Sequence, residues 1–287
     1  MTTAPPTVST AWLAENLDSP TPPVLLDATV FLEVINEETK FVSGINQYVD
    51  AHIPGARFAD LFEKFSDPGN PLPFTRPDTA QFEAAASEIG VDNNTRVVVY
   101  DALAGQWAAR LWWLFRSFGH DQVSVLDGGL QKWVREDRPT TDRFDGYTRA
   151  QFTAESRDEL VSDHTAVEAA ITNGTYSLAC SLEQEDFAGR VKVRARVGHI
   201  PTSINIAPSS LINREDNTLK DNALLLQLFA DSQLELQGPI IVYCGGGIGS
   251  ALLSLALYRV GISGVSLYDG SLLEWVSIDR LPLVTGD

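Results

Sequence analysis

The sequence predicts an α/β fold that is built twice, as two domains of mostly parallel sheet flanked by helices. Short runs of Val, Ile and Leu without polar alternation are typical of buried parallel strands. Helical segments lie between them, and this alternation indicates βαβ units. The third observation is a set of motifs that recurs in the two halves. The five expected strands are Val24–Leu26, Val97–Tyr100, Val123–Leu126, Ile240–Tyr243 and Val265–Tyr268.

The repeated motifs occur in the same order in the two halves. In each half the tripeptide His-Ile-Pro is followed by an apolar strand that ends in a tyrosine. A loop of small residues then leads into an apolar helix and a glycine, and an Asp-Gly pair and a tryptophan come next. We interpret this order as a gene duplication. The paired residues are His52 and His199, Tyr100 and Tyr243, Gly119 and Gly261, Asp127 and Asp269, and Trp133 and Trp275.

Helices are expected between the strands, where apolar residues recur at helical spacing. Gly90, Gly119 and Gly261 each follow such a segment. A glycine commonly caps a helix C-terminus because it adopts a positive φ without steric cost. The expected helices are Thr79–Ile89, Trp107–Phe118, Thr165–Thr172 and Ser250–Val260.

The division into domains follows from the repeat and from one polar stretch. The 287 residues suit one large domain or two of medium size. The stretch from Arg135 to Arg149 is mostly charged and polar, which is typical of a linker. We expect an N-terminal domain over residues 1–140, a linker over 141–160 and a C-terminal domain over 161–287.

The charge balance excludes two classes of partner. The chain has 38 acidic and 21 basic residues, a formal net charge of −17. Nucleic acids and anionic membranes attract basic surfaces, so neither is expected to bind. The N-terminus lacks the basic and apolar segments of a signal peptide, and the apolar stretch 251–262 is too short to span a bilayer. We expect a cytoplasmic protein.

Cysteine and histidine content limits the metal chemistry. The chain has two cysteines and four histidines. Two cysteines cannot form a disulfide scaffold or a four-thiolate metal site, and the scattered histidines lack ligand spacing. No metal is therefore expected, although one cysteine can still be a nucleophile. None of these features predicts an oligomeric state.

The segment richest in chemistry begins at Cys244. This cysteine follows the expected strand Ile240–Tyr243, and a glycine-rich loop after it opens a helix. Glycines let successive backbone N–H groups point inward as an anion-binding nest, and the helix adds its positive end. Both effects favour the thiolate, the nucleophilic form of cysteine. The expected anion-binding residues are Gly245, Gly246, Gly247, Ile248, Gly249 and Ser250.

Three other interpretations of this loop are weaker. A lone cysteine at a strand end can be a buried small hydrophobe, but four glycines in the next five positions favour a functional loop. A P-loop requires a Lys-Ser or Lys-Thr pair, which this loop lacks. A cysteine phosphatase carries a phosphate-gripping arginine where Ser250 stands here, so that function is disfavoured.

These motifs resemble those of two-domain rhodanese-type sulfurtransferases, the family that includes thiosulfate and 3-mercaptopyruvate sulfurtransferases. The resemblance covers nearly the whole chain and implies two tandem rhodanese-like domains. The matching segments are His52–Ala56, Ala108–Trp113, Val125–Gly129, Gly198–Pro201, Tyr268–Ser271 and Leu281–Gly286.

The resemblance implies a covalent mechanism at Cys244. This residue would take a sulfane sulfur from a small anionic donor, thiosulfate or 3-mercaptopyruvate, and pass it from a persulfide to a thiol or cyanide. No cofactor is expected, because the thiolate itself carries the sulfur. The equivalent position in the first half is Asp101, after Tyr100. Because a carboxylate cannot carry sulfur, the N-terminal domain is expected to be non-catalytic.

Three features depart from the family's pattern. The family's Asp-Ala-Arg or Asp-Ser-Arg is here Ala179-Cys180-Ser181, which removes a substrate-binding arginine. Gly246 stands where mercaptopyruvate enzymes carry a serine, and the loop lacks the two basic residues of thiosulfate enzymes. A persulfide-carrying or regulatory protein with weak turnover is therefore the alternative function. Cys180 is expected to serve packing, and a role as a resolving thiol is the alternative.

A basic run precedes the second His-Ile-Pro motif. Its members alternate, which on an extended segment places them on one side. We expect Arg194 or Arg196 to bind the anionic donor in place of the missing arginine. The alternative is a solvated strip paired with Glu183, Glu185 and Asp186. The run consists of Arg190, Lys192, Arg194 and Arg196.

Overall fold

The protein, described here by a computed structural model over residues 3–36 and 38–286, divides into two compact units. The first unit contains the chain as far as Gly69, with Arg76–Ser156 and Arg214–Thr218. The second contains Asn70–Thr75, Arg157–Asn213 and the chain from Leu219 onward. Each unit thus includes one short segment from the other half of the sequence. Residues 141–156, part of the predicted linker, belong to the first unit.

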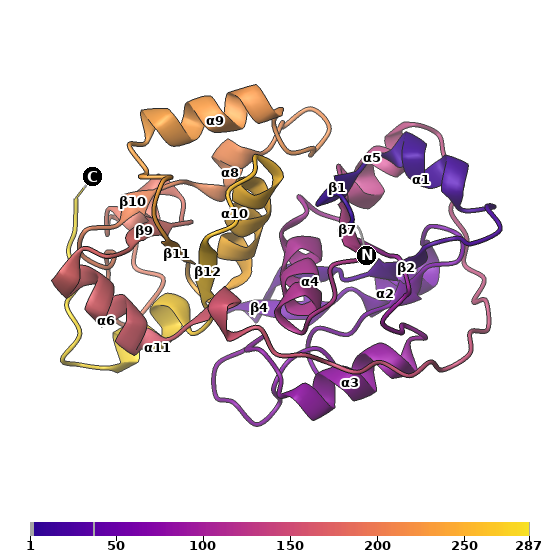
Figure 1. Cartoon of the computed structure of the whole chain (residues 1–287), viewed down its shortest axis with the longest axis horizontal. Helices are drawn as coiled ribbons and strands as arrows, with labels where there is room; N and C mark the ends of the chain where they lie inside the picture. The colour runs from indigo at the N-terminus through magenta and orange to yellow at the C-terminus, as the bar shows by residue number, and fades with distance from the viewer. Residues whose placement is uncertain (1–2, 37, 287) are drawn as a thin grey trace. The chain divides into compact units, whose positions relative to one another are not determined.

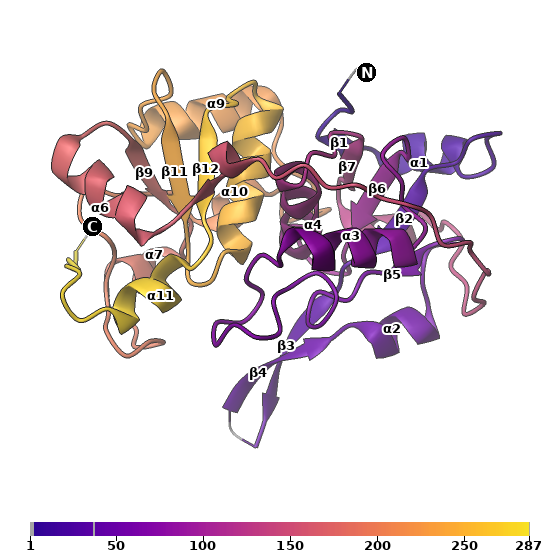
Figure 2. The same cartoon turned by 60° about the horizontal axis from the view of Figure 1, so that its bottom comes forward.

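The sheet of the first unit has five parallel strands in the order β1 (Thr7–Val8), β7 (Val123–Leu126), β6 (Val97–Tyr100), β2 (Val24–Asp27) and β5 (Arg57–Phe58). Its helices are α1 (Thr10–Asn16), α2 (Ile45–Asp50), α3 (Thr79–Glu88), α4 (Gln106–Ser117) and α5 (Gly129–Arg135). Helices cover both sides of this sheet (Figures 1 and 2), which explains why the residues of β6 are buried and apolar. On one side α3 packs on α4 through the rings of Phe82 and Phe115, whose centroids are 5.2 Å apart.

The second unit repeats this arrangement. Its five parallel strands lie in the order β10 (Ile204–Asn205), β9 (Ser177–Cys180), β11 (Ile240–Tyr243), β12 (Val265–Tyr268) and β8 (Val161–Ser162). Its helices are α6 (His164–Asn173), α7 (Gln184–Phe187), α8 (Pro208–Leu211), α9 (Asn222–Asp231), α10 (Ile248–Arg259) and α11 (Ser271–Ser277), with a 3-10 turn at Asp158–Leu160. Helices α6 and α11 lie on one side of the sheet and α8, α9 and α10 on the other (Figure 1).

The principal elements confirm the sequence predictions. All five expected strands form, and the four expected helices form with ends shifted by one or two residues. The three glycines expected to follow helices have positive φ angles of 74° at Gly90, 88° at Gly119 and 92° at Gly261. These conformations end the helices because a residue with a Cβ adopts them only at a steric cost.

The sequence repeat also appears as a repeat of contacts. In each half the isoleucine of His-Ile-Pro donates its backbone N–H to the tyrosine hydroxyl at the end of the central strand, and the tryptophan Nε1 donates to a proline carbonyl. The distances are 3.4 Å for Ile53 and Tyr100, 3.1 Å for Ile200 and Tyr243, 2.7 Å for Trp133 and Pro139, and 2.8 Å for Trp275 and Pro282. The conserved order of motifs in the two halves therefore serves the fold.

The short segment Arg214–Thr218 is held in the first unit by polar contacts. Asp216 Oδ2 lies 3.3 Å from Lys132 Nζ, and Asn217 Nδ2 donates a hydrogen bond of 2.7 Å to Gln131 Oε1. Lys132 and Gln131 belong to α5, so this segment of the second half of the sequence completes the surface of the first unit.

A two-stranded antiparallel hairpin in the first unit was not predicted. It consists of β3 (Val30–Ile35) and β4 (Glu38–Ser43) and extends away from the parallel sheet (Figure 2). Leu32 and Val34 are 60% and 74% exposed, respectively. These apolar residues do not enter a core, so the hairpin lacks the burial on which the strand predictions rest.

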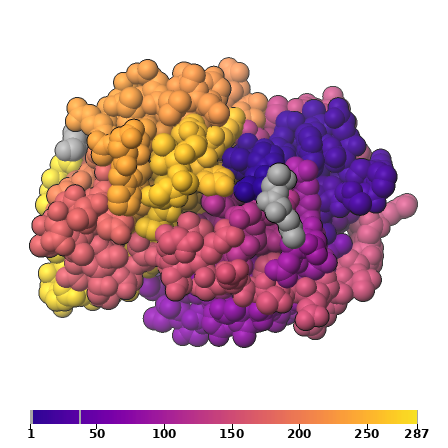
Figure 3. All heavy atoms as spheres, in the orientation of Figure 1, coloured from indigo at the N-terminus to yellow at the C-terminus, as the bar shows by residue number. Residues whose placement is uncertain are grey.

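Helix α9 forms an outer layer of the second unit, orange at the upper edge of Figure 3. It begins at the N-cap Asp221, whose side chain accepts the backbone N–H of Leu224 at 2.9 Å. Leu225 and Phe229 face the core, whereas Leu224 and Leu226 are exposed. Among the helices of the described residues, none is both long and apolar enough to cross a membrane.

Candidate active site

Cys244 lies at the carboxyl end of the central strand β11, immediately before the loop that opens α10. Its side chain is almost fully buried, with 4% exposure. Its backbone N–H donates to Ser271 Oγ at 3.2 Å, and Ser271 donates in turn to the Tyr268 carbonyl at 2.8 Å. The cysteine backbone is therefore fixed by the first residue of α11, which is itself bonded to the end of β12. Ligands of parallel sheets commonly bind at this edge.

The loop after Cys244 depends on its glycines. Gly247 is the N-cap of α10 with φ +84°, a left-handed conformation that favours glycine. A Cβ at Gly249 would lie 3.0 Å from the Ser181 carbonyl and 3.6 Å from the Cys244 Cβ. Gly249 thus lets the first turn of α10 approach both the cysteine and β9. The positive end of a helix of 12 residues is consequently directed at the loop.

Ser250, in the first turn of α10, reaches the sulfur through its side chain. Its hydroxyl donates a hydrogen bond to Cys244 Sγ with an oxygen–sulfur distance of 3.5 Å. Ser250 is fully buried. Of the predicted loop residues Gly245–Ser250, Ser250 thus contacts the sulfur directly through its hydroxyl.

The equivalent loop of the first unit shows what this geometry binds. Asp101 Oδ1 accepts the backbone N–H groups of Leu103 at 2.8 Å and Gly105 at 3.0 Å, and Oδ2 accepts those of Trp107 at 3.0 Å and Ala108 at 2.9 Å. Burial raises the pKa of Asp101 and these bonds oppose the rise. The loop thus holds an acidic group on four backbone donors, as expected for an anion-binding nest.

The two loops correspond through their N-cap glycines. Gly105 has φ +83° before α4, and Gly247 has φ +84° before α10. Three residues beyond each glycine stand Ala108 and Ser250. The N–H of Ala108 already binds the carboxylate, which supports a similar N–H cradle around the residue at the Cys244 position.

Arg194 is the basic residue that the structure brings to this loop. Its Nη1 lies 3.5 Å from the position that a Cβ on Gly245 would occupy. Its Nη2 donates to Asp186 Oδ1, and the two side chains are only 9% and 17% exposed. The guanidinium is thus held beside the loop by a partly buried ion pair.

The other predicted arginine lies against a different segment. Arg196 donates to the carbonyl of Leu281 at 2.6 Å and to that of Ile278 at 3.4 Å. The basic run also bends rather than running extended, and Arg190 pairs with Glu185 at 3.1 Å. Two pairs match the alternative expectation, Arg190 with Glu185 and Arg194 with Asp186, whereas Arg196 binds carbonyl groups, and the run does not form one extended basic side.

Ser181 and Cys180 lie at the end of β9, beside the loop. Ser181 stands where the family carries an arginine, and within residues 3–36 and 38–286 its buried Oγ has no hydrogen-bond partner. Cys180 is fully buried, and burial raises the pKa of its thiol strongly. Cys180 therefore stays protonated and packs in the core, as expected from the sequence.

Sequence reasoning assigned no function to Ser271 or to the hydroxyl of Ser250. Ser271 ends the segment Tyr268–Ser271 that resembles the rhodanese-type family, and that resemblance was the available signal. The Ser250 hydroxyl had no such signal, because its contact depends on the helix orientation. Within the described part of the chain, no group of three or more His, Cys, Asp or Glu side chains could hold a metal ion.

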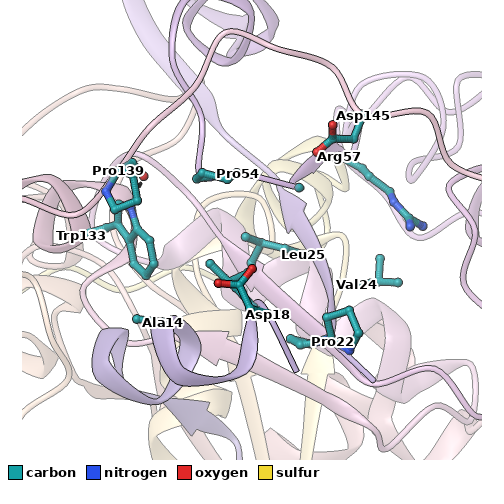
Figure 4. Close-up of a pocket in the computed structure, with 13 residues that line it drawn as sticks. Ala14, Asp18, Pro22, Val24, Leu25, Pro54, Arg57, Trp133, Pro139 and Asp145 are labelled. Carbon is teal, nitrogen blue, oxygen red and sulfur yellow. Dashed lines mark hydrogen bonds between the residues drawn. The ribbon is translucent and has the colours of Figure 1, made fainter. Parts of the chain in front are cut away.

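A separate cleft of about 690 Å³ lies in the first unit. Its lining includes Pro22, Val24 and Leu25 at the beginning of β2, with Trp133 and Pro139 on the opposite side in Figure 4. This is the amino end of β2, whereas both loops described above follow the carboxyl ends of strands. The cleft lining contains no cysteine, so the cleft is not the candidate active site.

Comparison with protein-family models matches the chain to the rhodanese-like domain over residues 9–136 and 181–278. The chain belongs to the rhodanese family. The two matched stretches coincide with the two halves of the repeat, which confirms the family expected from the sequence.

The curated relatives of this rhodanese-family protein are named for two different sulfur donors. It is 33% identical over 277 residues to thiosulfate sulfurtransferase of Rattus norvegicus, covering 93% of this chain and 91% of the relative. It is 33% identical over 279 residues to 3-mercaptopyruvate sulfurtransferase of Escherichia coli, covering 96% of each. The human 3-mercaptopyruvate sulfurtransferase is 31% identical over 276 residues, covering 93% and 91%. The protein is therefore a sulfurtransferase of the thiosulfate/3-mercaptopyruvate type, and overall identity does not separate the two donors.

The crystal structure of SseA from Escherichia coli, described as a 3-mercaptopyruvate enzyme with the rhodanese fold, is similar to this sulfurtransferase. Its TM-score is 0.83 at 31% identity, covering 93% of this chain and 99% of that one. This similarity and the two sheets confirm the expected α/β fold of two tandem rhodanese-like domains.

Proposed function

We propose that Cys244 is the nucleophile that carries sulfur through a persulfide. With thiosulfate, the Cys244 thiolate attacks the outer sulfur, the bond between the two sulfurs breaks, and sulfite leaves with the electron pair. With 3-mercaptopyruvate, the carbon–sulfur bond breaks and the carbon takes a proton to give pyruvate. The observation that carries this proposal is the burial of Cys244 in a glycine loop at the start of α10.

The second half-reaction returns the enzyme to its starting state. A thiol or cyanide attacks the outer sulfur of the persulfide, and the bond to Cys244 Sγ breaks. Cys244 leaves as a thiolate, so the backbone N–H groups of Gly245–Ser250 can stabilise the negative charge at both stages. The four N–H donors on Asp101 support this use of the loop.

The donor's anionic group is proposed to bind Arg194. This guanidinium lies beside Gly245 and is held there by Asp186. It offers a cation at the loop, where the strand-end arginine is replaced by Ser181. Arg196, whose guanidinium binds the Leu281 carbonyl, is proposed to have a structural function instead.

The N-terminal domain, residues 1–140, is proposed to be non-catalytic. Asp101 occupies its loop, and its carboxylate already accepts the four N–H groups that a sulfur anion would need. The catalytic domain is then residues 161–287, with Cys244 as its sulfur carrier. The sulfurtransferase activity would therefore depend on a single cysteine.

Intact-mass measurement after incubation with each donor separately tests the proposal. The wild-type protein should gain the mass of one sulfur atom, and Cys244→Ser should gain none. With cyanide present, thiosulfate should yield thiocyanate in the wild type, and 3-mercaptopyruvate with dithiothreitol should yield pyruvate and sulfide. Loss of both products in Cys244→Ser is expected, because no other side chain would accept the sulfur.

Cys180→Ala is the matched control, because Cys180 is fully buried and protonated. It should keep both the adduct and the turnover. An adduct that persists in Cys244→Ser would overturn the proposal. An adduct on wild-type Cys244 with only a single turnover would instead favour the persulfide-carrying function.

A further inference from the structure

The hydroxyl of Ser250 is placed to act on the reacting sulfur. Its hydrogen bond to Cys244 Sγ, 3.5 Å long, joins the first turn of α10 to the end of β11. Ser250 has no exposed surface and Cys244 has only 4%, so bulk water does not compete freely for this contact. A hydrogen bond in such an environment is stronger than one in water.

The direction of this hydroxyl is unusual for a serine within a helix. Serines in helices often donate to the carbonyl four residues earlier, which here would be Gly246. A hydroxyl has one proton to donate, and Ser250 donates it to the sulfur. The corresponding position in the first unit is Ala108, whose side chain has no hydroxyl to donate. The hydroxyl is thus found in the loop that holds the cysteine and not in the loop that holds Asp101.

We propose that Ser250 is a catalytic residue whose hydroxyl stabilises negative charge on Cys244 Sγ. This inference rests on the proposed function of Cys244 as the sulfur carrier. The third loop position, Gly246, has no side chain, so the hydroxyl reaches the sulfur from the helix instead. A hydrogen bond to a charged acceptor is about twice as strong as one between neutral groups, so the thiolate gains more than the thiol.

The bond acts in both half-reactions. Before the first, it stabilises the Cys244 thiolate relative to the thiol. During the second, the bond between Sγ and the outer sulfur breaks and Sγ departs with the electron pair. The Ser250 proton then lies next to the new charge, and it stays on the oxygen throughout. The hydroxyl therefore stabilises the Cys244 thiolate both when the thiol ionises and when Sγ departs from the outer sulfur. It keeps its own proton in both steps.

Alkylation of Cys244 by iodoacetamide tests the first effect, because the reagent reacts with the thiolate. In Ser250→Ala the rate at neutral pH should fall about tenfold, while the plateau rate in strong base should match the wild type. Peptide mass analysis assigns the alkylated residue. Ser254→Ala, a buried serine one turn further along α10, is the matched control and should alkylate as the wild type does.

Steady-state kinetics test the second effect. In Ser250→Ala, kcat for thiocyanate formation should fall about tenfold with little change in the donor KM, because the donor's anionic group binds elsewhere. Ser250→Thr and Ser250→Val are nearly equal in shape and differ in the hydroxyl. Thr should therefore keep the alkylation profile and Val should lose it, even if either change alters the packing of the helix.

Equal alkylation profiles for the Thr and Val variants, or a wild-type profile in Ser250→Ala, would overturn the inference. The intact-mass experiment separates this failure from failure of the proposed function. If wild-type Cys244 takes up sulfur while the Ser250 variants are indistinguishable from wild type, only the inference about Ser250 fails. If wild-type Cys244 takes up no sulfur, the proposed function itself fails.

Discussion

At the scale of single residues, the first unit contains two buried carboxyl groups, those of Asp27 and Asp101, whose hydrogen-bond partners differ. Asp101 has four backbone donors. Asp27 Oδ1 accepts the backbone N–H of Thr29 at 2.9 Å and its hydroxyl at 2.5 Å. Burial raises the pKa of Asp27 to about 6, and the bonds from Thr29 oppose that rise only in part. The folded protein therefore favours the protonated form of Asp27 more than the unfolded chain does.

This shift predicts a pH dependence of stability. The folded pKa of about 6 lies above the ordinary value of 3.8, so the stabilisation is fully present below that ordinary value and is lost as the pH rises through 6. The loss is about 3 kcal/mol. The Asp27→Asn variant lacks this titration. Between about pH 4 and pH 7, the difference in unfolding free energy between the variant and the wild type should therefore change by about 3 kcal/mol in favour of the variant. Urea unfolding at several pH values, with hydrogen exchange of β2 amides assigning the transition to the first unit, measures it. A constant difference between the two proteins would contradict the prediction.

Arg194 carries a second prediction at this scale. Arg194→Ala removes the cation beside Gly245 and should raise the KM for either anionic donor about tenfold or more, because a hydrogen bond to a charged group is lost. Steady-state assays with thiosulfate and with 3-mercaptopyruvate measure the effect. Lys192→Ala, a change to an exposed member of the same basic run, is the control and should leave KM unchanged. Equal KM values for the two variants would show that Arg194 does not bind the donor.

At the scale of elements, much of the candidate site could be predicted because it lies in one continuous segment. Strand, cysteine, glycine loop and helix follow one another from Ile240 to Arg259, so their geometry is determined locally. The basic run was harder, because its bends place Arg194 near the loop and Arg196 near Leu281. Such placements depend on tertiary contacts that have no local pattern in sequence.

The β3–β4 hairpin was missed for a different physical reason. Several of its apolar residues, such as Leu32 and Val34, are exposed rather than buried. The patterns that identify strands reliably reflect burial of one or both faces. A hairpin that leaves the sheet without a covering layer gives no such pattern.

Gly198 lies next to a short backbone bridge between His199 and Val284, and this contact leads to a prediction about stability. The two residues exchange backbone hydrogen bonds of 2.9 and 3.0 Å. Gly198, next to His199, has φ +100°, and a Cβ there would lie 2.1 Å from the Val284 carbonyl oxygen. Gly198→Ala should therefore lower the unfolding free energy of the second unit by about 2–3 kcal/mol.

Thermal or urea unfolding measures this loss, and Gly174→Ala is the matched control. Gly174 also has a positive φ, +62°, but a Cβ there would meet no atom within 4 Å. This variant should lose only the smaller cost of the left-handed backbone, about 1 kcal/mol. Equal losses in the two variants would show that the contact with Val284 is not the cause.

At the scale of the whole molecule, the duplication was the most predictable property. Repeated residues such as Tyr100 and Tyr243 make equivalent hydrogen bonds in the two units. A repeat is visible in sequence because both copies must satisfy the same fold. The two copies differ in chemistry at one equivalent place: Asp101 follows the central strand of the first unit, and Cys244 follows that of the second.

The repeat does not predict which short segments of the chain belong to which unit. Residues 70–75 belong to the second unit and 214–218 to the first. The second segment is fixed by side chains of α5, including the ion pair of Asp216 with Lys132. The sequence repeat fits two halves joined by one linker. Each compact unit, however, contains segments from both halves of the sequence.

This exchange of short segments has a consequence for how the duplicated gene can evolve further. No single cut in the chain releases both units with all of their residues, because a cut near residue 156 separates Asp216 from Lys132. Recombination that transplants one half into another gene would deliver an incomplete module. A half moved alone would lack the contact between Asp216 and Lys132, so the two halves are expected to remain joined in one chain.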